Sequence, residues 1–138
     1  MKRLNFTLLF LVQILVADVR TDVQAIVFKH LEAVKRKDLA ACMRLVHRHS
    51  PVYESTQNYL QTLLTQFEMH YTFKHYRFIG TDSNYAYAKV TLETRKLQGP
   101  PFESNVAEVL WTFKPDDKGW KYWNQSNISM KPIKIGVR

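Results

Sequence analysis

The feature that most constrains this chain is a change in the spacing of its apolar residues near residue 70. Before that point apolar residues recur every three or four positions, as in amphipathic helices; after it they alternate with polar residues, as in half-buried strands. The chain has 138 residues, which is the size of one domain. Helices followed by a run of strands indicate an α+β domain with the helices on one face of an antiparallel sheet.

Three helices are predicted in the first half of the chain, over residues 18–35, 39–46 and 54–69. Asp38 is placed to cap the second helix, because its carboxylate can accept a hydrogen bond from a backbone N–H of the first turn. The first helix carries one apolar stripe, whose members recur with the helical period: Val23, Ile26, Val27, Leu31 and Val34. This stripe predicts which face of the helix is buried.

Four strands are predicted to follow, over residues 71–79, 85–97, 103–114 and 120–126. The second and third strands are long, and successive side chains point to opposite faces of the sheet. One face of the second strand carries small and apolar residues: Ala86, Ala88, Val90, Leu92 and Thr94. The corresponding face of the third carries Ala107, Val109, Trp111 and Phe113. The opposite faces carry the charged residues Lys89, Glu93, Arg95 and Glu108.

Residues 1–17 have the pattern of a secretory signal peptide. Lys2 and Arg3 form a basic start, an apolar run of about a dozen residues follows, and Ala17 is a small residue at a suitable cleavage position. The run is shorter than the roughly 20 apolar residues of a membrane-spanning helix, so no stable membrane span is predicted. We expect export and cleavage after Ala17. The alternative is an N-terminal helix that packs on a cytoplasmic domain.

Charge and cysteine content narrow the classes of partner. The formal net charge is +8, but the basic residues are spread over every predicted element and no nucleic-acid motif is present, so no specific nucleic-acid partner is expected. An exported chain of this charge would meet anionic polymers instead. One Cys excludes an intrachain disulfide framework. Asn124 and Asn127 begin two glycosylation triplets, which become relevant in a eukaryotic secretory route.

Four segments between residues 20 and 128 carry a combined pattern: Lys37-Asp38-Leu39 after the first helix, the loop from His47 to Pro51, the stretch from Val90 to Phe102, and the hairpin from Asp117 to Trp123. Together they resemble the nuclear transport factor 2-like superfamily, which includes SnoaL-like and ketosteroid isomerase-like proteins. The resemblance covers most of the chain.

The resemblance implies a cone with a cystatin-like α+β fold. In such a fold three N-terminal helices pack in the concavity of a strongly bent, mainly antiparallel sheet, here over residues 18–128. The open end of the cone often forms a hydrophobic pocket for a small ligand, and members often form homodimers through the outer face of the sheet. The basic segment 129–138 would then be a C-terminal tail or an edge strand.

The catalytic patterns of the superfamily are incomplete here. The isomerase pattern uses an Asp base inside the cone, but Asp82, Asp116 and Asp117 all fall in predicted turns. The epoxide hydrolase pattern uses an Asp-Arg-Asp cluster, and Arg95 has no evident Asp partner. His47 and His49 lack a third spaced ligand, so no metal and no other cofactor is predicted.

Polar and aromatic residues remain as site candidates. A carboxylate beside an Arg inside the pocket can orient a ligand or act as a base, whereas on the outer face the same residues form a surface ion pair. The candidates for catalysis are Glu108, Tyr53, His47 and Glu93. The candidates for ligand binding are Tyr53, Arg95, Glu108, Trp111 and Trp123.

These features favour a non-enzymatic domain that is exported, dimeric, and binds a small apolar ligand or another protein. The alternative is an isomerase or lyase of the same fold, which requires at least one carboxylate, Tyr or His inside the cone. A third function, electrostatic binding of acidic polymers, predicts affinity that falls steeply with salt.

Overall fold

The computed structural model describes the backbone of residues 4–134 and the side chains of residues 19–134. Three helices come first: α1 (Leu4–Lys35), α2 (Leu39–Arg44) and α3 (Tyr53–Gln66). Four strands follow: β1 (Glu68–Asp82), β2 (Tyr85–Gln98), β3 (Asn105–Asp116) and β4 (Gly119–Pro132). The strands form one antiparallel sheet in the order β1-β2-β3-β4, which confirms the predicted α+β order.

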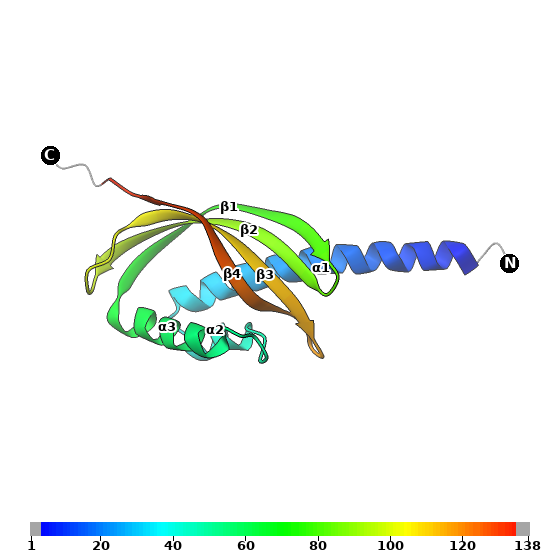
Figure 1. Cartoon of the computed structure of the whole chain (residues 1–138), viewed down its shortest axis with the longest axis horizontal. Helices are drawn as coiled ribbons and strands as arrows, with labels where there is room; N and C mark the ends of the chain where they lie inside the picture. The colour runs from blue at the N-terminus through cyan, green and yellow to red at the C-terminus, as the bar shows by residue number, and fades with distance from the viewer. Residues whose placement is uncertain (1–3, 135–138) are drawn as a thin grey trace.

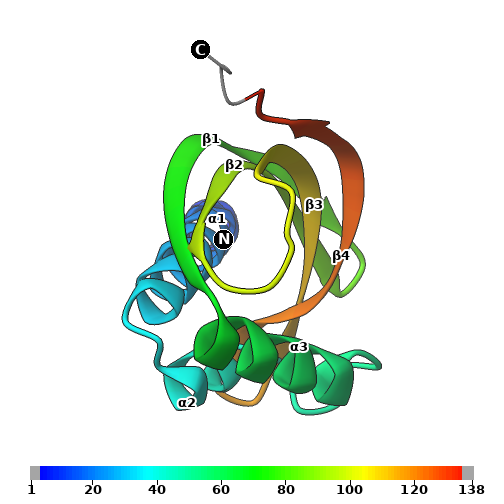
Figure 2. The same cartoon turned by 90° about the vertical axis from the view of Figure 1, so that its left-hand side faces the viewer.

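The sheet is bent and covers the helices on one side. Figure 1 shows α1 running beneath the strands, with α2 and α3 below it. Figure 2, seen along the length of α1, shows the four strands arching over the helical layer. No helix of the described residues covers the convex side of the sheet in either view. The expected cone, with its helices in the concavity, is therefore confirmed.

The main core lies where α1 packs against the concave face of the sheet. Val23 and Val27 of α1 are fully buried, and so is Phe113 of β3. Burial of each side chain of this size stabilises the fold by about 2 kcal/mol. The predicted inward faces of β2 and β3 supply most of the sheet's contribution. The buried members of this cluster are Val23, Ile26, Val27, Leu31, Ala86, Ala88, Val90, Val109, Trp111 and Phe113.

A second cluster joins the three helices to one another. Cys42 of α2 is fully buried in it, as its apolar neighbours predict. The side chain of Asp38 accepts a hydrogen bond of 3.0 Å from the backbone N–H of Ala41, which confirms the predicted cap of α2. The buried members of the cluster are Ala33, Val34, Cys42, Met43, Val46, Leu60 and Leu64.

A backbone bridge attaches the loop after α2 to β4. The backbone N–H of His47 donates to the carbonyl of Tyr122, and the N–H of Tyr122 donates to the carbonyl of Leu45, both at 2.8 Å. The hydroxyl of Ser50 donates to the carbonyl of Trp123. These bonds fix the helical layer against the edge of the sheet, because the two elements share main-chain hydrogen bonds as well as apolar contacts.

The boundary between α3 and β1 differs from the prediction. The third helix was expected to reach Met69, but α3 ends at Gln66. Glu68 pairs with Gln98 and Met69 pairs with Lys96, so both residues belong to β1. Pairing with the long β2 strand therefore decides their conformation, and local helical spacing does not.

The C-terminal segment continues the sheet. β4 runs to Pro132, which pairs with Asn105, and the backbone N–H of Ile133 donates to the carbonyl of Ser104 at 2.9 Å. The first residues of the basic segment 129–138 therefore form an edge strand, which is one of the two predicted alternatives. Residues 135–138 lie outside the described part of the chain.

The predicted signal peptide falls in the first half of α1. This helix begins at Leu4, and its first turns extend beyond the sheet in Figure 1. The side chains of residues 1–18 lie outside the described set, so cleavage after Ala17 stays a prediction. Among residues 19–134, whose side chains the structure describes, no helix combines the length and the apolar character that crossing a membrane requires.

Candidate functional site

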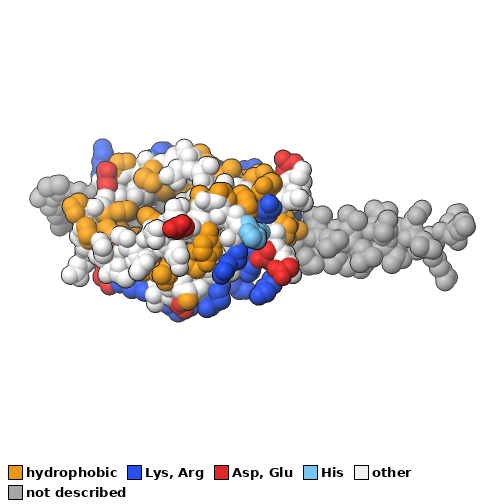
Figure 3. Space-filling model, turned by 60° about the horizontal axis from the view of Figure 1, so that its bottom comes forward, with side chains coloured by type: hydrophobic (Ala, Val, Ile, Leu, Met, Phe, Trp, Pro, Cys, Tyr) orange, Lys and Arg blue, Asp and Glu red, His pale blue; other side chains and the backbone are white. Residues whose placement is uncertain are grey.

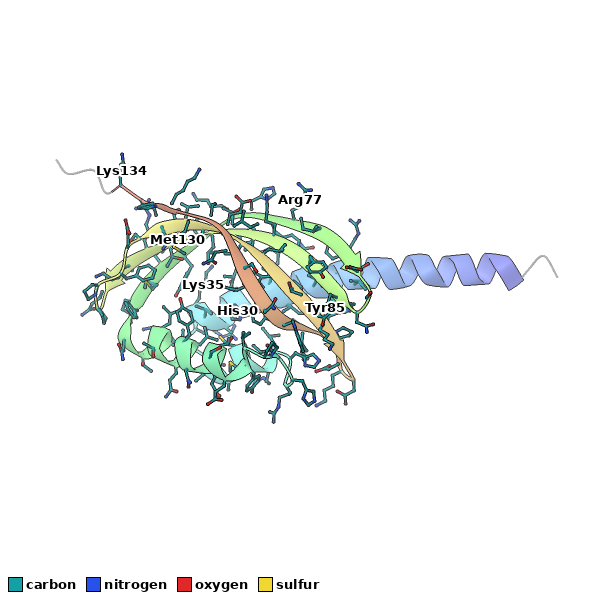
Figure 4. All side chains as sticks on the ribbon, in the orientation of Figure 1. His30, Lys35, Arg77, Tyr85, Met130 and Lys134 are labelled. Atoms are coloured by element: carbon teal, nitrogen blue, oxygen red, sulfur yellow. The ribbon has the colours of Figure 1, made fainter. Side chains whose placement is uncertain are left out.

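A cavity of about 600 Å³ lies between α1, α3 and the concave faces of β2, β3 and β4. Most of its wall is apolar, and polar side chains interrupt the wall at a few places. The lining residues are His30, Leu31, Tyr59, Leu60, Leu63, Tyr71, Val90, Leu92, Thr94, Phe102, Glu103, Asn105, Ala107, Val109, Trp111, Gln125, Asn127 and Met130. Figure 4 shows His30 on α1 beneath the sheet and Met130 toward the end of β4.

Strand pairing explains the apolar wall. Val90 pairs with Val109 and Leu92 pairs with Ala107, so the inward faces of β2 and β3 form one continuous apolar surface. Their alternate neighbours point outward, since successive side chains of a strand lie on opposite faces. Because Thr94 pairs with Asn105, the same two faces become polar toward one end of the cavity.

β4 supplies a polar side to the cavity. Asn127 pairs with Val109 and Gln125 pairs with Trp111, which places both amides on the concave face. A register shift between Glu108 and Val109 precedes this pairing and sets which β4 residues turn inward. Two side-chain amides therefore stand next to the apolar wall, each able to donate and to accept a hydrogen bond.

One end of the cavity is closed by the segment before β3. Asn105 is 7% exposed, and its Nδ2 donates a hydrogen bond of 2.9 Å to the backbone carbonyl of Glu103. Glu103 is itself exposed and supplies a carboxylate at the same end. Phe102 contacts Phe67 with ring centroids 6.0 Å apart, which holds this segment against the end of α3. The charged group therefore lies at the rim of the cavity.

A smaller cavity of about 360 Å³ adjoins the first. It lies beside α3, where Val52, Ser55 and Thr56 form part of its lining. The residues that line both cavities are His30, Tyr59, Leu60, Trp111 and Gln125. The two cavities therefore adjoin at these residues.

His30 is the titratable group at the centre of this arrangement. It lies on α1 three residues after Val27 and four after Ile26, which puts it on the buried stripe of the helix. Its ring meets Trp111 edge to face, with centroids 5.4 Å apart. Burial lowers the pKa of His30 from 6.5 to about 4, because desolvation disfavours the charged imidazolium. At neutral pH His30 is therefore an uncharged imidazole that can donate one hydrogen bond and accept another.

The tyrosines of the cavity are also uncharged at neutral pH. Burial raises the pKa of Tyr71 to about 12, and it raises the pKa values of Tyr59 and Tyr122 in the same direction. Tyr59 stays 62% exposed, at the outer side of the cavity on α3. Away from the rim, the two cavities therefore offer neutral hydrogen-bonding groups in an apolar surround.

The predicted carboxylates lie on the convex face of the sheet. Glu93 forms ion pairs with Arg95 at 2.7 Å and with Lys74 at 3.2 Å, and Glu108 forms one with Lys89 at 2.7 Å. Hydrogen bonds from Lys74 and Arg95 hold the pKa of Glu93 below its ordinary value. Successive side chains of a strand lie on opposite faces of the sheet, and these three lie on the face opposite the cavities. Glu93, Arg95 and Glu108 therefore line neither cavity.

His47 lies in the loop after α2 and not in either cavity. It is buried, its Nδ1 accepts a hydrogen bond of 3.1 Å from the backbone N–H of His49, and its Nε2 lies 3.3 Å from the carbonyl of Pro115. Its ring also meets Trp123 edge to face at 5.0 Å. Both ring nitrogens therefore have partners inside the fold, and His47 holds the loop against β4 rather than facing a ligand.

The predicted aromatic residues are divided between the cavity and this loop. Trp111 lines both cavities. Trp123 lies beside Lys114, whose Nζ is 4.5 Å from its ring centroid, and Tyr53 lies beneath the guanidinium of Arg48 at 5.8 Å. Tyr53 and Trp123 line neither cavity, so Trp111 is the predicted site residue that the structure places in the cone.

Sequence reasoning missed His30, Asn105 and Gln125. His30 could have been found, because it continues the helical spacing of the apolar stripe on α1. Gln125 depended on a register that β4 alone does not reveal, since a shift in pairing precedes it. No cluster of three or more His, Cys, Asp or Glu side chains suited to a metal ion occurs in the described residues.

Figure 3 looks onto the helical side of the molecule. Hydrophobic and uncharged polar side chains occupy most of this face, and Lys and Arg side chains gather toward its lower edge. The outward residues of α3 are mainly uncharged: Gln57, Asn58, Gln61, Thr62, Thr65 and Gln66. The surface next to the cavities is therefore polar without being strongly charged.

Solved structures share this architecture. The chain matches a nuclear transport factor 2-like protein with a cystatin-like fold from Novosphingobium aromaticivorans, with a TM-score of 0.65 over 86% of each chain at 12% identity. A nuclear transport factor 2-like protein from Cytophaga hutchinsonii matches with a TM-score of 0.64 at 16% identity, over 83% of this chain and 98% of that chain. A ketosteroid isomerase-like protein from Erwinia carotovora atroseptica matches with a TM-score of 0.55 at 17% identity, over 77% and 93%. The fold is therefore that of the nuclear transport factor 2-like superfamily, as the sequence pattern predicts.

The amino-acid sequence matches a family model over residues 25–133, which is most of the chain. The chain belongs to the family described as "Anti-sigma-I factor RsgI9, C-terminal domain". No curated protein sequence matches the chain.

The pKa of His30 gives a prediction for stability. Because the folded pKa of about 4 lies below the ordinary 6.5, the neutral form stabilises the fold fully above pH 6.5, and this contribution is lost as pH falls toward 4. The shift corresponds to about 3 kcal/mol of unfolding free energy. We expect urea denaturation of His30→Gln to show a flatter loss of stability between pH 7 and pH 4 than wild type. The exposed His75→Gln is the control and should keep the wild-type slope; an unchanged slope in His30→Gln would contradict this role of His30.

Proposed function

We propose that this chain binds a small, largely apolar molecule in the 600 Å³ cavity and does not change it chemically. The observation that supports this is the lining of the cavity: a continuous apolar wall from β2 and β3, with neutral polar groups at a few positions. Cavities of roughly 300–1,000 Å³ with this kind of lining are typical of small-molecule sites. The lining of the cavity supports this class of ligand.

The polar groups favour an uncharged ligand. His30 is neutral and the hydroxyl of Tyr71 is protonated at neutral pH, while Asn127 and Gln125 are amides. Gln125 and Asn127 are exposed, but beside the half-buried His30 and Tyr71 a charged ligand group would lose hydration without gaining an ion pair, which is unfavourable. The carboxylate of Glu103 lies at the rim, where it remains exposed. The ligand that fits is an apolar body with one or two hydrogen-bonding groups.

Filling the cavity should abolish this binding. Ala107→Phe adds a ring to the inward face of β3, so the affinity for a neutral apolar fluorophore such as N-phenyl-1-naphthylamine should fall by about tenfold or more. Fluorescence titration measures the change. Gln57→Phe is the control, because it adds a ring at an exposed position of α3 that lines neither cavity and should leave the affinity unchanged. Equal affinity of the two variants would place the fluorophore outside the cavity and overturn the proposal.

The alternative function is that of an isomerase or lyase. The observation in its favour is His30, an unprotonated base in a largely apolar cavity. The predicted carboxylates Glu93 and Glu108 have no such position, since both form ion pairs on the convex face. Of the residues that line the cavity away from its rim, His30 is then the candidate base.

Proton exchange separates the two functions. A ketone that displaces the fluorophore from the cavity is incubated with the protein in D₂O, and exchange of its α-protons is followed by NMR. Under the non-enzymatic proposal the exchange rate equals that of the ketone in buffer. A faster rate with wild type that returns to the buffer rate with His30→Gln would establish the alternative, with His30 as the base.

We further propose that the chain is exported and forms a homodimer through the convex face. The pattern of residues 1–17 supports export, and the absence of any described helix over the convex face supports a dimer. Apolar side chains such as Val106 and Leu110 lie on this face among the ion pairs. Neither export nor the homodimer depends on the identity of the ligand.

Native mass spectrometry of protein collected from the medium of a secreting eukaryotic host tests both properties. The expected mass is that of a dimer whose chains begin at Asp18. Treatment with a glycosidase separately shows any glycan at Asn124 or Asn127. A full-length chain found only inside the cells would contradict export, and a monomeric mass at micromolar concentration would contradict the dimer.

A further inference from the structure

A second concave surface lies outside the cone, between α1 and α2. This groove encloses about 450 Å³ and shares no lining residue with the two cavities described above. Its lining comes from one side of α1 and from α2: Phe28, Lys29, Glu32, Arg36, Ala41, Arg44 and Leu45. It is therefore a separate feature of the molecule.

The floor of the groove is apolar and belongs to the edge of the core. Phe28 is 39% exposed, although its inner side packs against Phe73 with ring centroids 5.0 Å apart. Leu45 packs against the main core, and Ala41 packs against the second cluster. An apolar chain laid on this floor would remove the exposed side of Phe28 from water, which is favourable by about 25 cal/mol for each Å² covered.

The walls of the groove are cationic. Lys29, Arg36 and Arg44 are exposed, and none of them forms an ion pair within the described part of the chain. The one carboxylate of the lining, Glu32, lies 3.7 Å from the ammonium of Lys35. Among the described residues, the lining of the groove therefore holds three cationic side chains and one carboxylate, that of Glu32.

One further cation lies at the α2 end of the groove. The ammonium of Lys121 on β4 donates a hydrogen bond of 3.2 Å to the backbone carbonyl of Arg44.

We propose that this groove binds an anionic single-chain amphiphile, with its carboxylate between Arg36 and Arg44 and its alkyl chain over Phe28 and Leu45. Guanidinium groups bind carboxylates through paired, charge-assisted hydrogen bonds, which fixes the orientation of the headgroup. The apolar floor explains why an alkyl chain is needed as well as a charge. A simple anion would leave Phe28 exposed, and a neutral chain would leave the cations unpaired.

Three ten-carbon probes of different headgroup charge test the proposal: decanoate, decanol and decyltrimethylammonium. Isothermal titration calorimetry below the micelle concentration of each probe gives the affinities. We expect decanoate to bind wild type roughly tenfold or more tightly than decanol, and decyltrimethylammonium to bind least, because its charge has the sign of the groove.

The variants locate the site. Arg36→Gln/Arg44→Gln should weaken decanoate binding by about tenfold, because both changes remove a cation from the headgroup position. Arg77→Gln/Lys131→Gln removes the same charge from exposed positions of β1 and β4 outside the groove and should leave the affinity unchanged. Figure 4 shows Arg77 on the opposite side of the sheet from the helices. Thermal melts should show both variants folded, since all four side chains are exposed.

Three outcomes would overturn the proposal. Equal binding of decanoate and decanol would show that the cations take no part. Equal weakening by the two double variants would show diffuse attraction to the basic surface. Loss of decanoate binding in Ala107→Phe, with Arg36→Gln/Arg44→Gln unaffected, would place the amphiphile in the cone. Failure of the fluorophore to bind the cone leaves the groove proposal unaffected, because the two sites share no residue.

Discussion

The packing of the apolar stripe of α1 into the concave face of the sheet is the contact on which the rest of this structure depends. Val23 and Val27 are fully buried there, opposite strands whose inward residues are equally apolar. The second cluster and the bridge at Tyr122 then hold α2 and α3 in place. Both cavities lie beside this contact, since α1 supplies a wall to each. The two cavities are therefore the space that remains between α1, α3 and the sheet once α1 has packed.

Most of the fold could be predicted from the sequence, because it rests on local periodicity. The stripe of α1, the cap at Asp38 and the alternating faces of β2 and β3 all have the predicted form. The boundaries were predicted less well where two segments compete for the same residues. Glu68 and Met69 continue a helical pattern, yet they pair with β2, and the end of β4 pairs with residues around Asn105. Such pairings depend on partners far along the chain.

The candidate site was harder to predict, and the reason is physical. Charged residues were the main site candidates in the sequence. Burying a charge in an apolar cavity is unfavourable, however, and Glu93, Arg95 and Glu108 lie on the convex face in ion pairs. Apart from Glu103 at the rim, the polar groups that line the cone are neutral ones, such as His30 and Gln125, and neutral residues of this kind do not stand out in a helix or strand pattern. Trp111 was a candidate for ligand binding on the apolar face of the third strand, and it lines both cavities.

The two cavities share His30, Tyr59, Leu60, Trp111 and Gln125 in their linings. Side chains change rotamer far more easily than a strand changes register, so the space at these shared residues can change while the sheet stays fixed. A short occupant of the larger cavity would leave the smaller cavity empty, whereas a longer one would have to pass His30 and Trp111 to reach it.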